Sequence, residues 1–171
     1  MITIHKATAK DSDVLTAIGR QSFIESHGRS AAQHDIDEYV AKTYTQEAIS
    51  DDLSDPANNY HIITYNSKPA GYSKIILNSG HPNIALHNVT KMERLYLLQE
   101  FYDKKLGREL LQFNIGLSNT NSQAGMWLFV WTGNTRAVKF YERSGFEIIG
   151  SHHFKLTENH SNPNYLMFLK Y

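Results

Sequence analysis

Apolar residues along this chain follow two different periods, and each period predicts one type of element. In the segment 104–118, leucine and phenylalanine recur every three or four residues, which predicts an amphipathic helix. The run 126–131 is apolar on both faces, as is typical of a central strand that is covered on both sides. Two further apolar and β-branched runs, 60–65 and 70–77, flank a turn at 67–69 and predict a β-hairpin.

The remaining segments complete a mixed α/β layout with one main sheet and helices on its faces. A polar loop that contains Pro163 is expected to join the last two strands. No linker, repeat or low-complexity segment divides the chain, so residues 1–171 are predicted to form a single domain. Further strands are expected at 2–7, 87–98, 146–156 and 165–170, and further helices at 13–24, 33–42, 46–53 and 134–144.

Composition and charge narrow the class of protein. Lys plus Arg equals Asp plus Glu, 17 against 17, so a surface that binds nucleic acid is not expected. The absence of cysteine excludes disulfides, thiolate metal sites and a cysteine nucleophile, and the nine histidines are scattered without the spacing of metal ligands. No run reaches the ~18 apolar residues of a membrane helix, and no secretory signal is visible. We therefore expect a cytoplasmic monomer or homodimer without a metal.

The loop from Tyr102 to Gly107 is a candidate phosphate site. It leaves one predicted strand and opens the helix at 104–118, where free amides and the helix dipole attract anions. Lys104, Lys105 and Arg108 add positive charge. An ordinary loop with solvated lysines explains the same residues, and this alternative stays open.

Glu93 and Tyr141 are the candidate acid–base residues. On a regular strand Glu93 shares a face with Leu95 and Leu97, while Arg94 shares the opposite face with its own neighbours. A carboxylate on an apolar face is costly, so Glu93 is either a base with a raised pKa or the partner of a nearby cation. Tyr141 has an ordinary pKa of about 10, above the about 8.5 of a thiol, and can protonate a departing thiolate. The alternative for Tyr141 is a core tyrosine whose hydroxyl bonds to a neighbour.

Residues 134–146, N-x-x-A-x-x-F-Y-x-x-x-G-F, resemble the second signature of the GNAT superfamily of acetyl-CoA-dependent N-acetyltransferases. The first signature of that family is similar to E-R-L-Y-L-L at 93–98 followed by L-G-R-E-L-L at 106–111. The resemblance covers nearly the full chain, and the first 55 residues loosely resemble the bacterial polyamine acetyltransferases.

This resemblance implies a fold and a cofactor. The fold is a single mixed, mostly antiparallel sheet whose central parallel strands splay apart, with helices on both faces. Acetyl-CoA would lie in the gap, with coenzyme A as the product. Backbone groups of Leu95 and Leu97 would pair with the pantetheine arm, and amides from Tyr102 to Arg108 would hold the pyrophosphate. The implied cofactor-binding residues are Leu95, Tyr96, Leu97, Tyr102, Asp103, Lys104, Lys105, Leu106, Gly107, Arg108, Asn134, Arg136, Tyr141 and Arg143.

The resemblance also implies catalytic roles. Tyr141 would protonate the leaving sulfur, Glu93 would act as the base through a water, and the Leu95 amide would stabilise the oxyanion. The family loop is usually Q/R-x-x-G-x-G/A, whereas here Tyr102 replaces Gln/Arg and Lys105 replaces the first glycine. A non-catalytic module that binds acetyl-CoA as a sensor is therefore the alternative to an enzyme.

The expected reaction moves an acetyl group directly to a primary amine of a small molecule, such as a polyamine, or of a peptide. The acceptor is expected between the N-terminal helices and the last hairpin. Glu25, Asp35, Asp37 and Glu38 lie in that region and would suit a cationic amine, although such residues more often form a solvated helix face. The residues expected to line the acceptor pocket are Phe23, Glu25, His27, Tyr39 and Tyr96.

Overall fold

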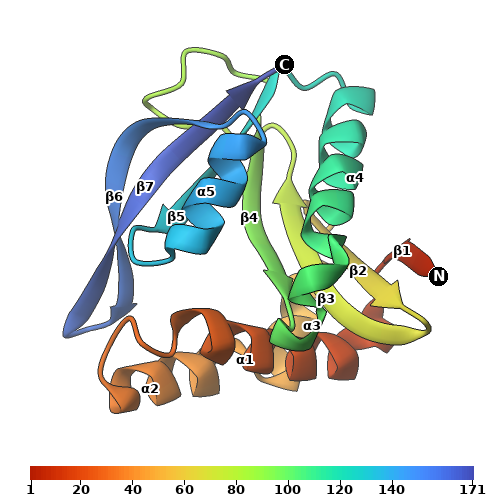
Figure 1. Cartoon of the computed structure of the whole chain (residues 1–171), viewed down its shortest axis with the longest axis vertical. Helices are drawn as coiled ribbons and strands as arrows, with labels where there is room; N and C mark the ends of the chain where they lie inside the picture. The colour runs from red at the N-terminus through yellow and green to blue at the C-terminus, as the bar shows by residue number, and fades with distance from the viewer.

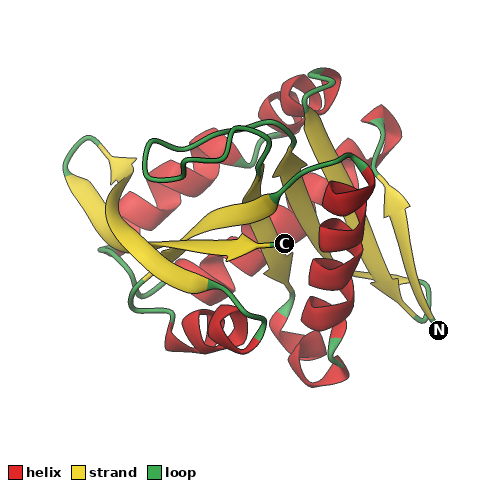
Figure 2. Ribbon diagram, turned by 90° about the horizontal axis from the view of Figure 1, so that it is seen from above, coloured by secondary structure: helices red, strands yellow, loops and turns green.

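The computed structural model describes residues 1–171 as one sheet with helices on both faces (Figures 1 and 2). None of the helices is both long and apolar enough to span a membrane. In chain order the elements are β1 (Ile2–Lys6), η1 (Ala9–Asp11), α1 (Ser12–His27), α2 (Gln33–Thr43), α3 (Gln46–Ser54), β2 (Asn58–Tyr65), β3 (Lys68–Ile76), β4 (Thr90–Leu97), η2 (Gln99–Lys104), α4 (Leu106–Thr120), β5 (Gly125–Trp131), α5 (Thr135–Arg143), β6 (Glu147–Thr157) and β7 (His160–Lys170).

The seven strands form one mixed sheet in the order β1-β2-β3-β4-β5-β7-β6. Every neighbouring pair is antiparallel except the central pair β4–β5, which is parallel. This arrangement confirms the mixed, mostly antiparallel sheet that the sequence predicts.

The central strands β4 and β5 separate soon after they meet. They pair only at Thr90 with Met126 and at Lys91 with Trp127. Beyond these pairs β4 continues along β3, and β5 continues along β7, so the two halves of the sheet diverge (Figure 1). We call this divergence the fork. Backbone groups on the inner edges of the fork lack the strand partner that a closed sheet would provide.

Helices cover opposite faces of the sheet, as adjacent residues of β3 indicate. The Tyr72 hydroxyl donates to that of Tyr44, the residue after α2, at 3.3 Å. On the other face, Asn114 of α4 donates to Ser73 at 2.9 Å. Because successive strand residues face opposite sides, the N-terminal helices and α4 lie on opposite faces.

Both predicted connections that contain proline differ in the structure. The turn predicted at 67–69 is wrong, because the tight turn is at Asn66 and Ser67, whose φ angles are 48° and 64°. Two residues with positive φ match the right-handed twist of a hairpin. The polar loop predicted around Pro163 is also wrong, because Pro163 lies within β7 opposite His153 of β6.

Pro163 is tolerated in this inner strand because β5 ends beside it. Its carbonyl accepts from the Thr132 amide at 3.0 Å, and Trp131 is the last residue of β5. The N–H and C=O of one strand residue point to the same side, so the amide hydrogen that Pro163 lacks would face the end of β5.

Glu93 occupies a bulge in β4. Lys74 of β3 pairs with Arg94, and the next residue, Ile75, pairs with Met92, so Glu93 has no partner on β3. Strict alternation therefore breaks at Glu93, and the prediction that it shares a regular face with the following leucines is wrong. The bulge lies immediately beyond the point where β4 leaves β5.

Candidate active site

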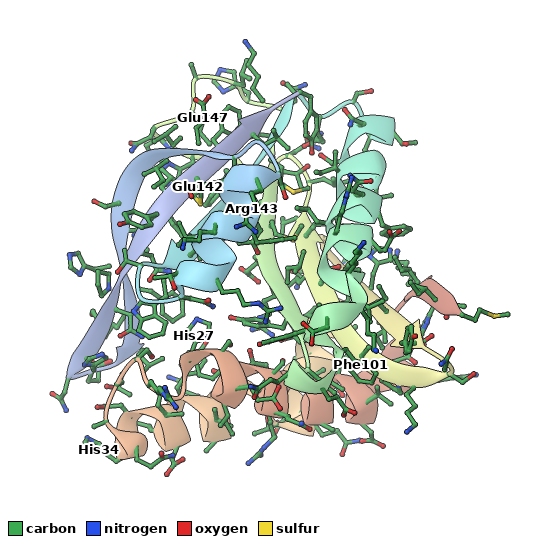
Figure 3. The ribbon with its side chains drawn as sticks, viewed as in Figure 1. His27, His34, Phe101, Glu142, Arg143 and Glu147 are labelled. Carbon is green, nitrogen blue, oxygen red and sulfur yellow. The ribbon has the colours of Figure 1, made fainter.

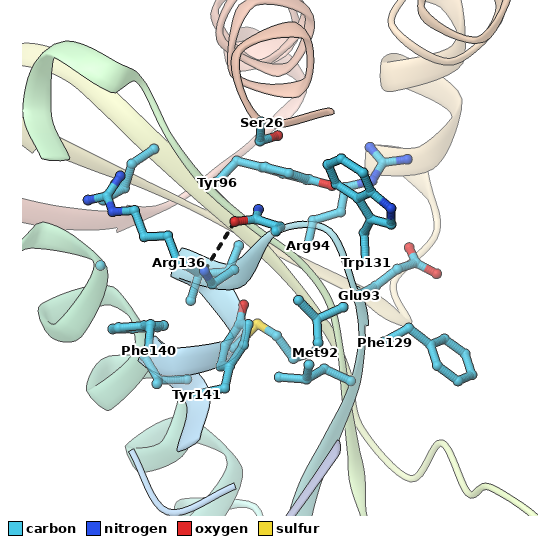
Figure 4. Close-up of a pocket in the computed structure, with 18 of the residues that line it drawn as sticks. Ser26, Met92, Glu93, Arg94, Tyr96, Phe129, Trp131, Arg136, Phe140 and Tyr141 are labelled. Carbon is cyan, nitrogen blue, oxygen red and sulfur yellow. Dashed lines mark hydrogen bonds between the residues drawn. The ribbon is translucent and has the colours of Figure 1, made fainter. Parts of the chain in front are cut away.

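The fork opens a cavity of about 1210 Å³ whose wall comes from both faces of the sheet. Gly107 of α4 and Tyr141 of α5 line it on one face, and Phe23 of α1 lines it on the other. Figure 4 shows Tyr141 at one side of this cavity and Arg94 at the other. The cavity thus connects two faces that a closed sheet would keep apart.

Tyr141 projects into the cavity from α5. The helix is fixed at its start by Asn134, whose side chain accepts from the Ala137 amide at 3.1 Å, and it is followed by Gly145 with a φ of 94°. Tyr141 is 7% exposed, and its hydroxyl makes no hydrogen bond within the protein yet is not sealed in the interior. Burial raises the pKa of Tyr141, so the hydroxyl stays protonated at neutral pH.

Glu93 lies in a cluster of charges at the fork. Lys74, nearly buried, binds Glu93 closely and Asp52 at 2.8 Å, while Lys91 lies 3.3 Å from Glu93. Burial alone would raise the pKa of Glu93, but the bond from Lys74 and the charges of Lys74, Lys91 and Arg94 outweigh it and hold the pKa below its ordinary range. The prediction of a raised pKa is therefore wrong, and the alternative, pairing with a cation, is confirmed.

The α4 end of the cavity combines a helix start with cationic side chains. Lys105, the residue before α4, has a φ of 60°, which is the left-handed region that glycine adopts freely. Glycine adopts this conformation without strain, which is a physical reason for the glycine that is usual at this position in the family that the loop resembles. The Arg108 amide donates to the Lys105 carbonyl at 3.1 Å, whereas Leu106 and Gly107 occupy the first helical positions, whose amides have no intrahelical partner.

Arg136 and Tyr102 join the two sides of this end. The guanidinium of Arg136, near the start of α5, lies 3.5 Å from the centre of the Tyr102 ring in η2. Such a cation–π contact stabilises by about 0.5–1 kcal/mol at an exposed site. Tyr102, which replaces Gln/Arg of the family motif, therefore holds a cation at the cavity. Four cationic residues line this end: Lys105, Arg108, Arg136 and Arg143.

Most of the predicted cofactor residues line the cavity, and three do not. Asp103 and Lys104 are exposed on η2, away from the wall, and Leu106 is buried in the core. The other residues of the set line the cavity: Leu95, Tyr96, Leu97, Tyr102, Lys105, Gly107, Arg108, Asn134, Arg136, Tyr141 and Arg143.

The other end of the cavity is aromatic. His27 stacks on Phe23 at 4.7 Å between ring centres, and Tyr39 lies at the same distance from Phe23. Burial lowers the pKa of His27 to about 4, so the ring is neutral at pH 7. Figure 3 shows His27 between α1 and the fork, whereas His34 lies at the outer end of α2. The five predicted acceptor residues all line the cavity: Phe23, His27, Tyr39 and Tyr96 at the aromatic end, and Glu25 beside η2.

The acidic residues of the N-terminal helices are engaged elsewhere. Glu25 lines the cavity, but its carboxylate accepts from the Gln99 amide at 2.7 Å. The buried Asp35 accepts from the Thr157 hydroxyl at 2.7 Å and ties α2 to β6. Three of the four predicted carboxylates do not line the cavity: Asp35, Asp37 and Glu38.

Several residues that line the cavity were not predicted. Lys74 has the clearest signal in the sequence, because it is a charged residue inside the apolar run 70–77. Trp131 stands at the end of β5, and its exposure to the cavity depends on the fork. Asn162 and Asn164 come from the part of β7 that was expected to be a loop.

Comparison with known proteins agrees with this geometry. Residues 23–146 match the acetyltransferase (GNAT) family. An uncharacterized N-acetyltransferase encoded in the pepI 3′ region of Lactobacillus delbrueckii subsp. lactis is 25% identical over 92% of this chain and 91% of its own. The spermidine N(1)-acetyltransferase of Thermoplasma acidophilum is 21% identical over 86% of this chain and 89% of its own.

Solved structures show the same fold. The PaiA N-acetyltransferase from Thermoplasma acidophilum, in complex with coenzyme A, superposes with a TM-score of 0.79 at 20% identity and covers 100% of this chain and 99% of its own. The ribosomal-protein-S18-alanine N-acetyltransferase from Escherichia coli gives a TM-score of 0.72 at 16% identity over 99% of this chain and 94% of its own. With the family match over most of its length, the chain belongs to the acetyltransferase (GNAT) family.

Proposed function

We propose that this protein transfers an acetyl group from acetyl-CoA directly to a primary amine of a small molecule or a peptide. The observation that carries the proposal is the Tyr141 hydroxyl, which has no partner in the protein and opens into the cavity at the fork. A hydroxyl that served only the core would be bonded to a neighbour. Acceptor and thioester would approach each other through the fork, from opposite faces of the sheet.

The residues of the α4 end fit a long phosphorylated carrier. At Gly107 even a methyl group would contact Leu97 and Phe140, 3.4 and 3.7 Å away, so a glycine keeps this wall open. The four cations of this end and the free amides that begin α4 suit a pyrophosphate. The related PaiA structure contains coenzyme A, which is consistent with the same carrier here.

Each proposed catalytic residue has a physical basis. Acetyl-CoA, when bound, supplies the acetyl group as a thioester, and the chain has no cysteine to carry that group covalently. The Leu95 amide, on β4 beyond its last pair with β5, is the proposed oxyanion donor. Tyr141 would give its proton to the leaving sulfur. Glu93, ionised at neutral pH, would accept the ammonium proton through a water and pass it on, because its lowered pKa makes it a weak base.

The proposal is tested by the release of coenzyme A thiol in the presence of a panel of amines: polyamines, amino acids and peptides with free N-termini. Tyr141→Phe is expected to lower kcat by ~10²–10⁴-fold, because it removes a general acid. The rise in Tm caused by acetyl-CoA should be retained, because the phenol oxygen is not needed to hold the carrier.

Tyr165→Phe is the matched control, because Tyr165 lies on β7 outside the cavity wall. Unchanged turnover in Tyr141→Phe would remove Tyr141 from the mechanism. Acetyl-CoA binding without thiol release for any amine would favour a sensor. No stabilisation by acetyl-CoA would contradict the proposed cofactor.

A further inference from the structure

Arg94 is a half-buried cation at the aromatic end of the cavity. It follows the Glu93 bulge on β4 and shares a face with Tyr96, which also lines the cavity. Its guanidinium lies over the Tyr44 ring at 5.3 Å, and its Nη1 donates to the Tyr60 hydroxyl at 3.2 Å. A cation–π contact with one aromatic ring and a hydrogen bond to another restrict the orientation of the planar guanidinium. Figure 4 shows Arg94 on the side of the cavity away from Tyr141.

The charge of Arg94 has no direct partner in the protein. Both nearby carboxylates, Asp52 and Glu93, bind Lys74, and Arg94 forms no ion pair with either. Only one of its five N–H donors is used, in the bond to Tyr60. None of its nitrogens is among the buried atoms that lack a partner, and Arg94 lines both the cavity at the fork and a smaller acidic hollow, so its free donors are accessible. A rigid cation with free donors at a ligand cavity is suited to an anion.

No carboxylate in the wall of the main cavity is free to offset Arg94, whereas Asp51, Asp52 and Asp55 lie with Arg94 in a separate, smaller hollow. Glu25 is bonded to a backbone amide, Glu93 is neutralised by two lysines, and Asp35, Asp37 and Glu38 lie outside the wall. The second positive charge of a diamine would therefore meet Arg94 without a carboxylate to balance it. A carboxylate at the same position would meet a cation that is already oriented.

We propose that Arg94 selects an acceptor that carries a carboxylate on the same small molecule as the reactive amine, in the manner of a free amino acid. This inference rests on the proposed acetyl transfer and names the acceptor class for it. The guanidinium binds the carboxylate through its free donors, and the amine is left to point toward the fork. The aromatic rings of Phe23, Tyr39 and Tyr96 surround the carbon chain between the two groups.

The test compares acceptors that differ by one carboxylate. Lysine and 1,5-diaminopentane share the same carbon chain with a terminal amine, and only lysine carries the acid. In the second pair, 4-aminobutanoate and 1,4-diaminobutane, both compounds carry the same aminopropyl chain. Its far end is a carboxylate in the first compound and an aminomethyl group in the second. The rate of thiol release with acetyl-CoA gives kcat/KM for each. We expect the carboxylated member of each pair to be preferred by roughly 10- to 100-fold, the effect of one hydrogen bond to a charged group.

Three substitutions of Arg94 sharpen the test. Arg94→Gln should lower kcat/KM for lysine more than for the diamine, so that the ratio approaches one. Arg94→Lys should keep part of the preference, because the positive charge remains but the planar set of guanidinium donors is lost. Arg94→Glu should reverse the preference. A Tm shift with acetyl-CoA that matches the parent protein would show that each variant is folded.

Lys42→Gln is the matched control for charge. Lys42 borders a smaller hollow of about 520 Å³ that also touches Arg94, but Lys42 does not line the cavity at the fork. Its loss should leave the lysine-to-diamine ratio unchanged. If Lys42→Gln changed the lysine-to-diamine ratio as much as Arg94→Gln does, the preference would come from the overall positive potential and not from a contact with Arg94. That result would overturn the proposal.

The possible failures are distinguishable. Preference of the parent protein for diamines, or a ratio that Arg94→Gln does not alter, would contradict the role of Arg94 while leaving acetyl transfer intact. Thiol release with no amine at all would contradict the acetyl transfer on which this inference rests.

Discussion

Lys74 sets the electrostatics of the fork at the level of single residues. It is 7% exposed at its side chain and binds two carboxylates, Asp52 and Glu93. A buried charge is costly unless it is paired, so each member of this cluster stabilises the others. Glu93 therefore stabilises the fold independently of any role in the reaction. The effect of a Glu93 variant on stability must be measured separately from its effect on turnover.

Glu93→Gln is expected to lower the free energy of unfolding at pH 7 by ~1–3 kcal/mol, because Lys74 loses one of its two counter-charges. Urea denaturation measures this difference. The folded protein lowers the pKa of Glu93, so its stabilisation is present above the ordinary carboxyl pKa and is lost as the pH falls through the lowered value. The two proteins should thus converge in stability at low pH.

Glu158→Gln is the control for this experiment, because its side chain is 83% exposed in the pair with Lys155. An exposed pair is screened by solvent and contributes little, so a smaller loss is expected. A Glu93→Gln deficit that stayed constant across the acid range would contradict the ion-pair explanation.

At the level of elements, the starts of α4 and α5 shape opposite walls of the anion end. Asn134 caps α5 with its side chain, which gives this residue a structural role beside the proposed contact with the cofactor arm. Lys105 precedes α4 in a left-handed conformation, which costs about 1–2 kcal/mol for a residue with a Cβ. The chain thus retains the backbone shape of the family loop without its glycine.

Lys105→Gly is expected to leave the free energy of unfolding unchanged or raise it by up to ~1 kcal/mol. It removes the left-handed strain, while the flexible unfolded chain offsets part of that gain. Acetyl-CoA affinity should fall at low salt, because one cation of the cavity wall is lost, and this deficit should shrink at high salt. Chemical denaturation and calorimetric titration at two salt concentrations measure both effects.

Lys104→Gly is the matched control one residue earlier. Lys104 has no positive φ and does not line the cavity, so the same substitution should destabilise the protein and leave acetyl-CoA affinity nearly unchanged. Equal loss of stability in the two glycine variants would contradict the strain at Lys105.

Across the whole molecule, distant segments close the aromatic end of the cavity. Thr157 of β6 donates to Asp35 of α2 at 2.7 Å, and Asn162 of β7 donates to Ser30, before α2, at 2.8 Å. These bonds hold the last hairpin against the N-terminal helices, while the anion end is formed by α4 and α5. The two ends of the cavity therefore depend on separate contacts.

Thr157→Val is expected to weaken the packing of the aromatic end of the cavity, where the acceptor is proposed to bind, and to leave the other end unchanged. It removes the donor to the buried Asp35, so the free energy of unfolding should fall by ~1–3 kcal/mol. KM for the amine should rise more than KM for acetyl-CoA, because only the acceptor wall loses a contact. Initial rates over both concentrations give the two constants. Thr3→Val is the control, because it removes an exposed hydrogen bond between Thr3 and Thr64 at β1, and it should change neither KM value. An equal rise of both KM values in Thr157→Val would contradict the separate support of the two ends of the cavity.

The predictable part of the site is local in sequence. The helix predicted at 134–144 closely matches α5 (Thr135–Arg143) and contains Tyr141, because helix formation depends on interactions that span a few residues. The pairing of Lys74 with Glu93 was not predictable, because it depends on the bulge that breaks alternation in β4. Pro163 was wrongly predicted to lie in a loop, because the sequence does not show that β5 ends beside it in the sheet.

The sequence by itself determined the type and order of most elements and the signatures at 93–111 and 134–146. Only the tertiary structure decided that Arg94 is a cation without an ion pair, that Glu93 is one of two acids bound to Lys74, and that three of the four helix carboxylates lie away from the cavity. The physical reason is range. Helix periodicity and capping act between near neighbours, whereas charge pairing and the fork depend on strands that meet only after the chain has folded.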